Sequence, residues 1–87
     1  MTNQIYTFYN RLSKRYGDCF AYPSDEFCQA RISELVQADK VNPGEVEICR
    51  IGEYDIQSGM ITPIAPVRID IPLKPNALPV NPPAKEV

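Results

Sequence analysis

Aromatic and basic side chains are interleaved in the first 22 residues, which is the part of the sequence best suited to ligand binding. The aromatic residues there are Tyr6, Phe8, Tyr9, Tyr16, Phe20 and Tyr22. The cations are Arg11, Lys14 and Arg15. Rings that stack on bases, beside cations that contact phosphates, hold single-stranded nucleic acid without reading its sequence. We predict phosphate contacts from the three cations and base stacking from Tyr9 and Tyr16, which bracket the basic segment.

These residues also have a structural interpretation. Alternate aromatic residues on a strand can fill the core of a small sheet instead of contacting a ligand. Arg31 and Arg50 are second-tier candidates for nucleic-acid contacts, because Arg31 lies beside the apolar stripe of a predicted helix and Arg50 interrupts a predicted strand. Each arginine can instead lay its aliphatic stem over the core and pair with a neighbouring acid.

Residues suited to catalysis are scarce. The chain has no histidine, the usual base for activating a serine or cysteine, and its four glycines form no phosphate-binding loop. Glu45 with Glu47, and Glu53 with Asp55, each place two carboxylates on one face of a strand, where a Mg²⁺ ion could bind. Exposed acids on strands are ordinary, however, and no third ligand is indicated. We therefore expect a protein without enzymatic activity, metal or cofactor.

Charge is distributed unevenly along the 87 residues, whose net charge is −2. Residues 1–17 carry three cations and no acid, whereas residues 18–55 carry nine acids and three cations. Bulk charge therefore does not favour nucleic-acid binding, but the basic first segment does. Cys19, Cys28 and Cys49 include no close pair, which favours a reducing, cytosolic compartment over a disulfide framework or zinc site. We recognise no signal peptide or membrane span and expect no membrane association.

The pattern of apolar residues and turn signals predicts an α+β fold of order β-β-α-β-β, with a small antiparallel sheet packed on one helix. Ser24, followed by two acids, predicts the N-cap of a helix that extends to Ala38. The apolar stripe of this helix comprises Cys28, Ile32, Leu35 and Val36. The strands are predicted over Gln4–Tyr9, Cys19–Tyr22, Val46–Ile51 and Met60–Ile64, with a loop over 10–18 and a hairpin turn over Asp55–Gly59.

Prolines divide the chain into two parts. Seven of the nine prolines lie between residues 63 and 83, where they remove backbone donors that a sheet or helix needs. We predict a small α+β domain over residues 1–64 and a proline-rich, extended or disordered tail over 65–87. The alternating segment Val67–Ile71 is a candidate edge strand. Because so short a domain buries little surface, we also expect a homodimer or other homo-oligomer.

Two stretches of the domain carry a more specific pattern. Phe20–Val36 reads FAYPSDEFCQARISELV and is similar to FxAPNDxxAxRxFxxLV, with Arg31 on the arginine of that pattern. Pro43–Ile64 is similar to PEDFELYRIGEYDxxTGxxxPI and shares the run RIGEYD. Both patterns belong to the small nonstructural protein of gokushoviruses, microviruses with circular single-stranded DNA genomes, which this chain resembles. It departs from the family at Asp18 and Cys19, where a Pro-Phe pair is usual.

The resemblance implies a DNA-binding phage protein made in the host bacterial cytoplasm. Such a protein acts in the switch from double-stranded replication to single-stranded DNA synthesis and in genome packaging into procapsids. Its expected partners are single-stranded or replicative-form DNA, and viral replication or procapsid proteins. The alternative function is that of a protein-interaction adaptor, which contacts a viral or host protein through its sheet edge or proline tail without binding DNA.

Overall fold

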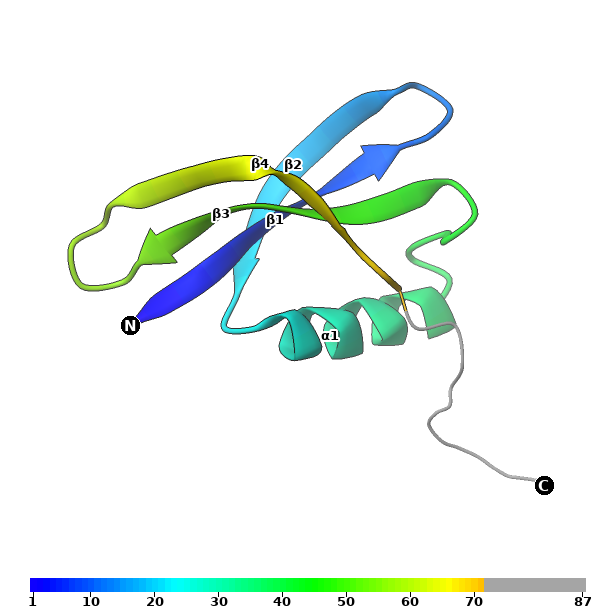
Figure 1. Cartoon of the computed structure of the whole chain (residues 1–87). Helices are drawn as coiled ribbons and strands as arrows, with labels where there is room; N and C mark the ends of the chain where they lie inside the picture. The colour runs from blue at the N-terminus through cyan, green and yellow to red at the C-terminus, as the bar shows by residue number, and fades with distance from the viewer. Residues whose placement is uncertain (72–87) are drawn as a thin grey trace.

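One helix covers one face of a four-stranded antiparallel sheet in the computed structural model, which describes residues 1–71 (Figure 1). In chain order the elements are β1 (Thr2–Asn10), β2 (Arg15–Tyr22), α1 (Asp25–Gln37), β3 (Val46–Asp55) and β4 (Ile61–Ile69). The strand order in the sheet is β2-β1-β3-β4, so β1 lies in the interior of the sheet beside β3. The predicted α+β fold of order β-β-α-β-β is confirmed.

The predicted loop over residues 10–18 is a tight turn between two longer strands. Asn10 organises this turn, because its side-chain oxygen accepts hydrogen bonds from the backbone N–H groups of Leu12 and Ser13, each at 2.9 Å. Lys14 closes the turn in the left-handed region, with φ of 59°. β2 therefore begins at residue 15, and the prediction that strand structure begins only at residue 19 was wrong.

β4 continues past Ile64, the predicted end of the domain. It runs through Pro63 and Pro66 to Ile69, which is possible because β4 is an edge strand and a proline there need not interrupt pairing with a neighbour. Ile69 and Ile71 pack against the core. The five residues after Ile64 thus belong to the sheet and not to the tail predicted over 65–87. Residues 72–87 of that predicted tail lie outside the described residues.

The helix begins where the sequence predicts. Ser24 is the N-cap, and its hydroxyl oxygen accepts a hydrogen bond from the backbone N–H of Phe27 at 3.2 Å. Two acids occupy the first turn, where the helix dipole favours negative charge. Cys28 and Ile32 are buried, and the other two residues of the predicted stripe pack partly buried beside them. This stripe is what attaches α1 to the sheet.

The core lies between α1 and one face of the sheet. Its fully buried side chains are Tyr6, Cys28, Ile32 and Ile48. Phe8, Phe20 and Tyr22 pack against them. Because side chains alternate along a strand, Ile5, Thr7 and Tyr9 of β1 point to the opposite face. Within residues 1–71 no helix covers that second face, which we call the open face (Figure 1). Its centre is nevertheless buried, since Thr7 is only 2% exposed.

Candidate nucleic-acid interface

Tyr9 and Tyr16 form a ring pair on the open face, at the end of the sheet that carries the β1–β2 hairpin. The strand register places the two residues opposite each other. Their ring centroids are 4.9 Å apart, with an angle of 55° between the ring planes. Tyr16 is 54% exposed and Tyr9 is partly buried beneath it. The geometry therefore brings together the two tyrosines predicted for stacking and leaves one ring accessible to a base.

The remaining aromatic residues of the first 22 positions have a different role. Tyr6 and Phe20 stack with their centroids 5.9 Å apart, and Phe8 lies 5.2 Å from Phe20. Tyr22 contacts the same group. All four lie on the helix side of the sheet, where they build the core. The structural interpretation of the alternating aromatic residues therefore holds for these four and not for the ring pair.

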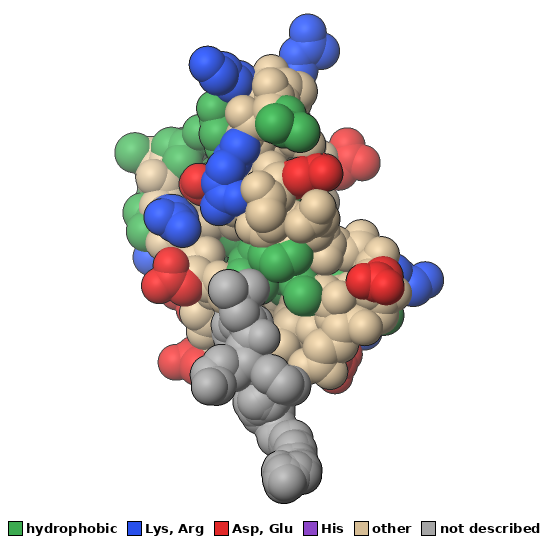
Figure 2. All heavy atoms as spheres, turned by 90° about the vertical axis from the view of Figure 1, so that its right-hand side faces the viewer, with side chains coloured by type: hydrophobic (Ala, Val, Ile, Leu, Met, Phe, Trp, Pro, Cys, Tyr) green, Lys and Arg blue, Asp and Glu red, His purple; other side chains and the backbone are tan. Residues whose placement is uncertain are grey.

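Lys14 and Arg15 lie in the same hairpin as the ring pair. Lys14 is in the turn, and Arg15 lies opposite Asn10 in the register, so alternation directs its side chain away from the face that carries Tyr16. Both side chains are exposed, and in the described part of the chain neither forms a salt bridge with an acid. Figure 2 looks at this end of the molecule and shows lysine and arginine side chains projecting above the rest of the surface. Unpaired cations in the same hairpin as an exposed ring are suited to the two contacts that a single strand needs, one to phosphate and one to a base.

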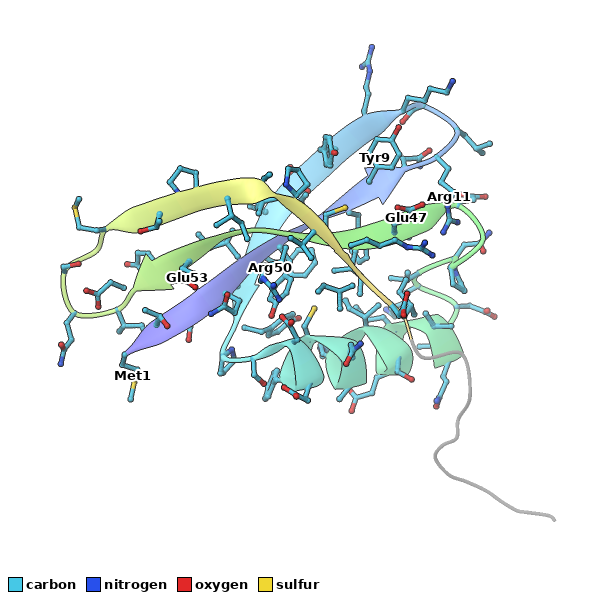
Figure 3. The ribbon with its side chains drawn as sticks, viewed as in Figure 1. Met1, Tyr9, Arg11, Glu47, Arg50 and Glu53 are labelled. Atoms are coloured by element: carbon cyan, nitrogen blue, oxygen red, sulfur yellow. The ribbon has the colours of Figure 1, made fainter. Side chains whose placement is uncertain are left out.

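Arg11, the third cation of the basic segment, is held by an acid. Its Nε donates a hydrogen bond to Glu47 at 2.9 Å, and its Nη1 donates to the carbonyl oxygen of Pro43 at 3.0 Å. Figure 3 shows Arg11 and Glu47 close to Tyr9 at the hairpin end of the sheet. Arg11 therefore ties the start of the β1–β2 turn to the segment that leads into β3. Its charge is partly neutralised, in contrast to the charges of its two neighbours.

Arg68 is a cation of this surface that the sequence prediction missed. The β3–β4 register places it opposite Cys49 on the open face, and its Nε lies 3.9 Å from Glu47. Arg68 and Arg11 both contact the Glu47 carboxylate. These three side chains together carry a formal charge of +1. The signal was present in the sequence, because Arg68 stands between Val67 and Ile69 and alternation sends it to the face opposite theirs.

Arg50 lies on the other side of the sheet from the ring pair. Its guanidinium contacts the carboxylate of Asp25, which also accepts a hydrogen bond from the Tyr6 hydroxyl at 2.7 Å. Figure 3 shows Arg50 extending from the sheet toward α1. This arrangement links the sheet to the first turn of the helix. The ion pair with Asp25 matches the structural alternative for Arg50, which lies apart from the ring pair. A nucleic-acid contact by Arg50 stays a prediction.

The same contacts shift the acidity of the linked groups. Burial on its own raises the pKa of Asp25, but hydrogen bonds from Tyr6 and Arg50 and the positive charge of Arg50 outweigh it, so the pKa lies below its ordinary value. Burial, followed by the hydrogen bond to Asp25, raises the pKa of Tyr6 far above that of a free tyrosine. Asp25 is therefore an anion and Tyr6 a neutral donor at neutral pH.

Arg31 is exposed on α1, and its Nη1 donates a hydrogen bond to Glu34 at 3.0 Å, one turn further along the helix. Because α1 covers the face opposite the open face, Arg31 does not join the ring pair either. Five of the seven predicted side chains therefore lie together at the hairpin end, on residues 9–16, and the two second-tier arginines lie elsewhere.

The described residues show little else that is suited to chemistry. They contain no group of three or more His, Cys, Asp or Glu side chains placed to hold a metal ion. No helix within residues 1–71 is long and apolar enough to span a bilayer. Cys28 and Cys49 are buried, and burial raises the pKa of the Cys28 thiol to about 11, so that its reactive thiolate is rare at neutral pH.

Comparison of the chain with protein-family models, with curated proteins and with solved structures finds no match. Inference about its function therefore depends on its own residues and their geometry.

Proposed function

We propose that this protein is a non-enzymatic binder of single-stranded DNA that acts through the end of the sheet that carries the β1–β2 hairpin. The observation that supports the proposal is the pair of Tyr9 with the exposed Tyr16, in the same hairpin as two cations, Lys14 and Arg15, that pair with no acid of the described chain. One base stacked on such a ring contributes roughly 1–3 kcal/mol. Phosphate contacts to the two cations add an electrostatic term that salt weakens.

The chemistry of this surface favours a single strand over a duplex. A stacking ring needs a base whose face is free, and the bases of a duplex are already stacked on one another. The net charge of −2 also argues against a broad positive surface along which a duplex could lie. Binding is therefore expected to be local, to cover few nucleotides and to tolerate changes in their sequence.

The biological role we propose is the one that the gokushovirus resemblance implies. In that role the protein, in the host bacterial cytoplasm, binds DNA and the viral replication or procapsid proteins during the switch to single-stranded DNA synthesis and genome packaging. The two resembling stretches correspond to the segment around α1 and to the β3–β4 hairpin. They support the role, whereas the ring pair and its cations support the DNA contact itself.

Fluorescence anisotropy with a labelled single-stranded oligonucleotide and its duplex tests the proposal. Removal of the exposed ring in Tyr16→Ala should weaken single-strand binding by roughly 5- to 150-fold, which is the equivalent of one lost stacking contact. The double variant Lys14→Ala/Arg15→Ala should lower the slope of log K against log salt by about 1.4, because each phosphate contact on a single strand contributes about 0.7.

Arg31→Ala is the matched control, since it removes one exposed cation from the far side of the molecule and should leave binding unchanged. Equal binding by the wild type and by the hairpin variants would refute the proposed site. Failure of the wild type to bind either oligonucleotide would refute direct DNA binding and favour the adaptor function.

A further inference from the structure

The other end of the open face is apolar. Side chains from all four strands line a shallow groove of about 540 Å³ there, among them Ile5, Cys19, Ala21, Ile51, Ile61 and Pro63. No charged side chain lines this groove. A contiguous apolar surface of this kind on a small soluble domain is typical of an interaction site. Since the groove walls offer no charge, the surface that covers it must itself be apolar where the two meet.

The chain carries such a surface next to the groove. The β3–β4 hairpin holds three exposed apolar side chains: Ile56 is 46% exposed, Met60 is 67% exposed and Ile61 is 60% exposed. Ile61 also forms part of the groove wall, so the hollow and the projecting side chains belong to one continuous patch. A two-fold interface uses the same patch on both subunits and therefore requires a patch that is complementary to itself. A hollow bordered by an apolar hairpin meets this requirement.

The described chain offers no cover of its own for the groove. Its last residues turn to the helix side of the sheet, where Ile69 and Ile71 pack against the core. The side-chain amide of Gln29 on α1 donates a hydrogen bond to the carbonyl oxygen of Asp70 at 2.9 Å. Ile71, the last described residue, therefore lies on the face opposite the groove.

Lateral association along β4 is also disfavoured. Pro63 and Pro66 lie in this edge strand, and proline has no N–H group to donate to an added strand. Face-to-face packing of two sheets needs no free edge and buries the apolar side chains directly. The two observations together favour contact through the open face over contact through this edge.

We propose that a second copy of this chain covers the groove, in a two-fold dimer whose open faces pack together at their apolar ends. Four strands about 4.8 Å apart and about eight residues long, at about 3.3 Å per residue, give the open face a projected area of roughly 500 Å². The apolar end and its hairpin supply only part of that area, whereas tight complexes bury about 800 Å² per partner. The dimer is therefore weak and concentration-dependent, and the ring pair at the other end stays uncovered.

Sedimentation equilibrium of the full chain between about 1 and 200 μM tests the proposal. The wild type should be a reversible mixture of monomer and dimer, and Ile61→Lys should raise the dimer dissociation constant at least 10-fold. Leu12→Lys is the matched control, because Leu12 is 77% exposed in the β1–β2 turn and outside the groove. A wild type that stays monomeric throughout, or a dimer that Ile61→Lys leaves intact, overturns the proposal.

Alkylation of Cys19 provides a second test on the wild-type chain, which does not depend on whether a variant folds. Cys19 is exposed in the groove, whereas Cys28 and Cys49 are buried and serve as internal controls. Reaction of Cys19 with N-ethylmaleimide should be fast in dilute solution and slow at least several-fold as the protein concentration rises. A rate that is independent of concentration overturns the proposal, because the groove is then either open or covered by the chain itself.

Discussion

Neutralisation of Asp25 should destabilise the fold by removing the link between the sheet and the helix. The Asp25 carboxylate accepts hydrogen bonds from Tyr6, whose side chain is fully buried, and from Arg50. An exposed ion pair contributes up to about 1 kcal/mol, and breaking a fully buried one costs about 3–5 kcal/mol. The Asp25 side chain is 33% exposed and that of Arg50 is 25% exposed. Solvent therefore screens the pair in part, and we expect Asp25→Asn to cost about 2 kcal/mol.

This loss is large for so small a domain. A cost of about 2 kcal/mol lowers the melting temperature by roughly 8–16 °C in a domain of 60–100 residues. Urea unfolding followed by circular dichroism at pH 7 measures the free-energy difference directly. Glu34→Gln is the matched control, because it neutralises another acid of α1 whose partner, Arg31, is exposed, and it should leave stability unchanged.

The pH dependence of the stability difference between wild type and Asp25→Asn can refute the role assigned to the Asp25 carboxylate. Because the pKa of Asp25 is lowered in the folded state, its contribution is present above the unfolded pKa, near 3.8, and is lost as the pH falls through the folded pKa. The stability difference between wild type and Asp25→Asn should therefore be constant from pH 7 to about 5 and shrink below pH 4. A difference that stays the same down to pH 3, or that is negligible at pH 7, would refute the assigned role of the carboxylate.

Two further experiments test the hairpins. Gly52→Ala would place a Cβ atom 2.9 Å from the backbone oxygen of Thr62 and should cost about 1–3 kcal/mol in urea unfolding, whereas Gly17→Ala meets only an ordinary contact of 3.7 Å and should be nearly neutral. Equal costs for the two variants would contradict this packing. Lys14→Gly should remove about 1 kcal/mol of strain from the left-handed backbone at residue 14 and so raise the melting temperature. The same substitution should weaken DNA binding, because it removes a cation. A lower melting temperature would count against that conformation.

The parts of the fold that local signals determine could be predicted from the sequence. Ser24 and the apolar stripe specify the start and the buried face of α1, and the predicted order of elements follows from them together with the strand patterns. The β1–β2 turn was missed because it contains no glycine. The Asn10 side chain accepts its backbone hydrogen bonds, and Lys14 adopts the left-handed conformation that glycine commonly supplies. The end of β4 was misplaced because prolines exclude a central strand but not an edge strand, and edge position is a property of the whole sheet.

The candidate site was predictable only in part, because the partner of a cation is not a local property. Arg11 pairs with Glu47, 36 positions away, and Arg50 pairs with Asp25, 25 positions away. Nothing near either arginine in the sequence distinguishes it from Lys14, which has no acidic partner in the described chain. Pairing across the sheet and between sheet and helix therefore determines which cations remain free to meet a phosphate.

The single helix accounts for both proposed surfaces. A sheet of four strands has two faces, and α1 covers only one of them, so within residues 1–71 no helix lies over the two ends of the other face (Figure 1). Toward the β1–β2 hairpin this face carries the tyrosine ring pair, and cations lie in the same hairpin, which suits single-stranded DNA with its phosphates and unstacked bases. Toward the β3–β4 hairpin the side chains of this face are largely apolar and uncharged, which suits a second copy of the same surface. Because the two chemistries lie at opposite ends of one face, dimer formation and DNA binding need not compete. The Ile61→Lys variant should accordingly lose the dimer but keep the salt-dependent binding of a single strand.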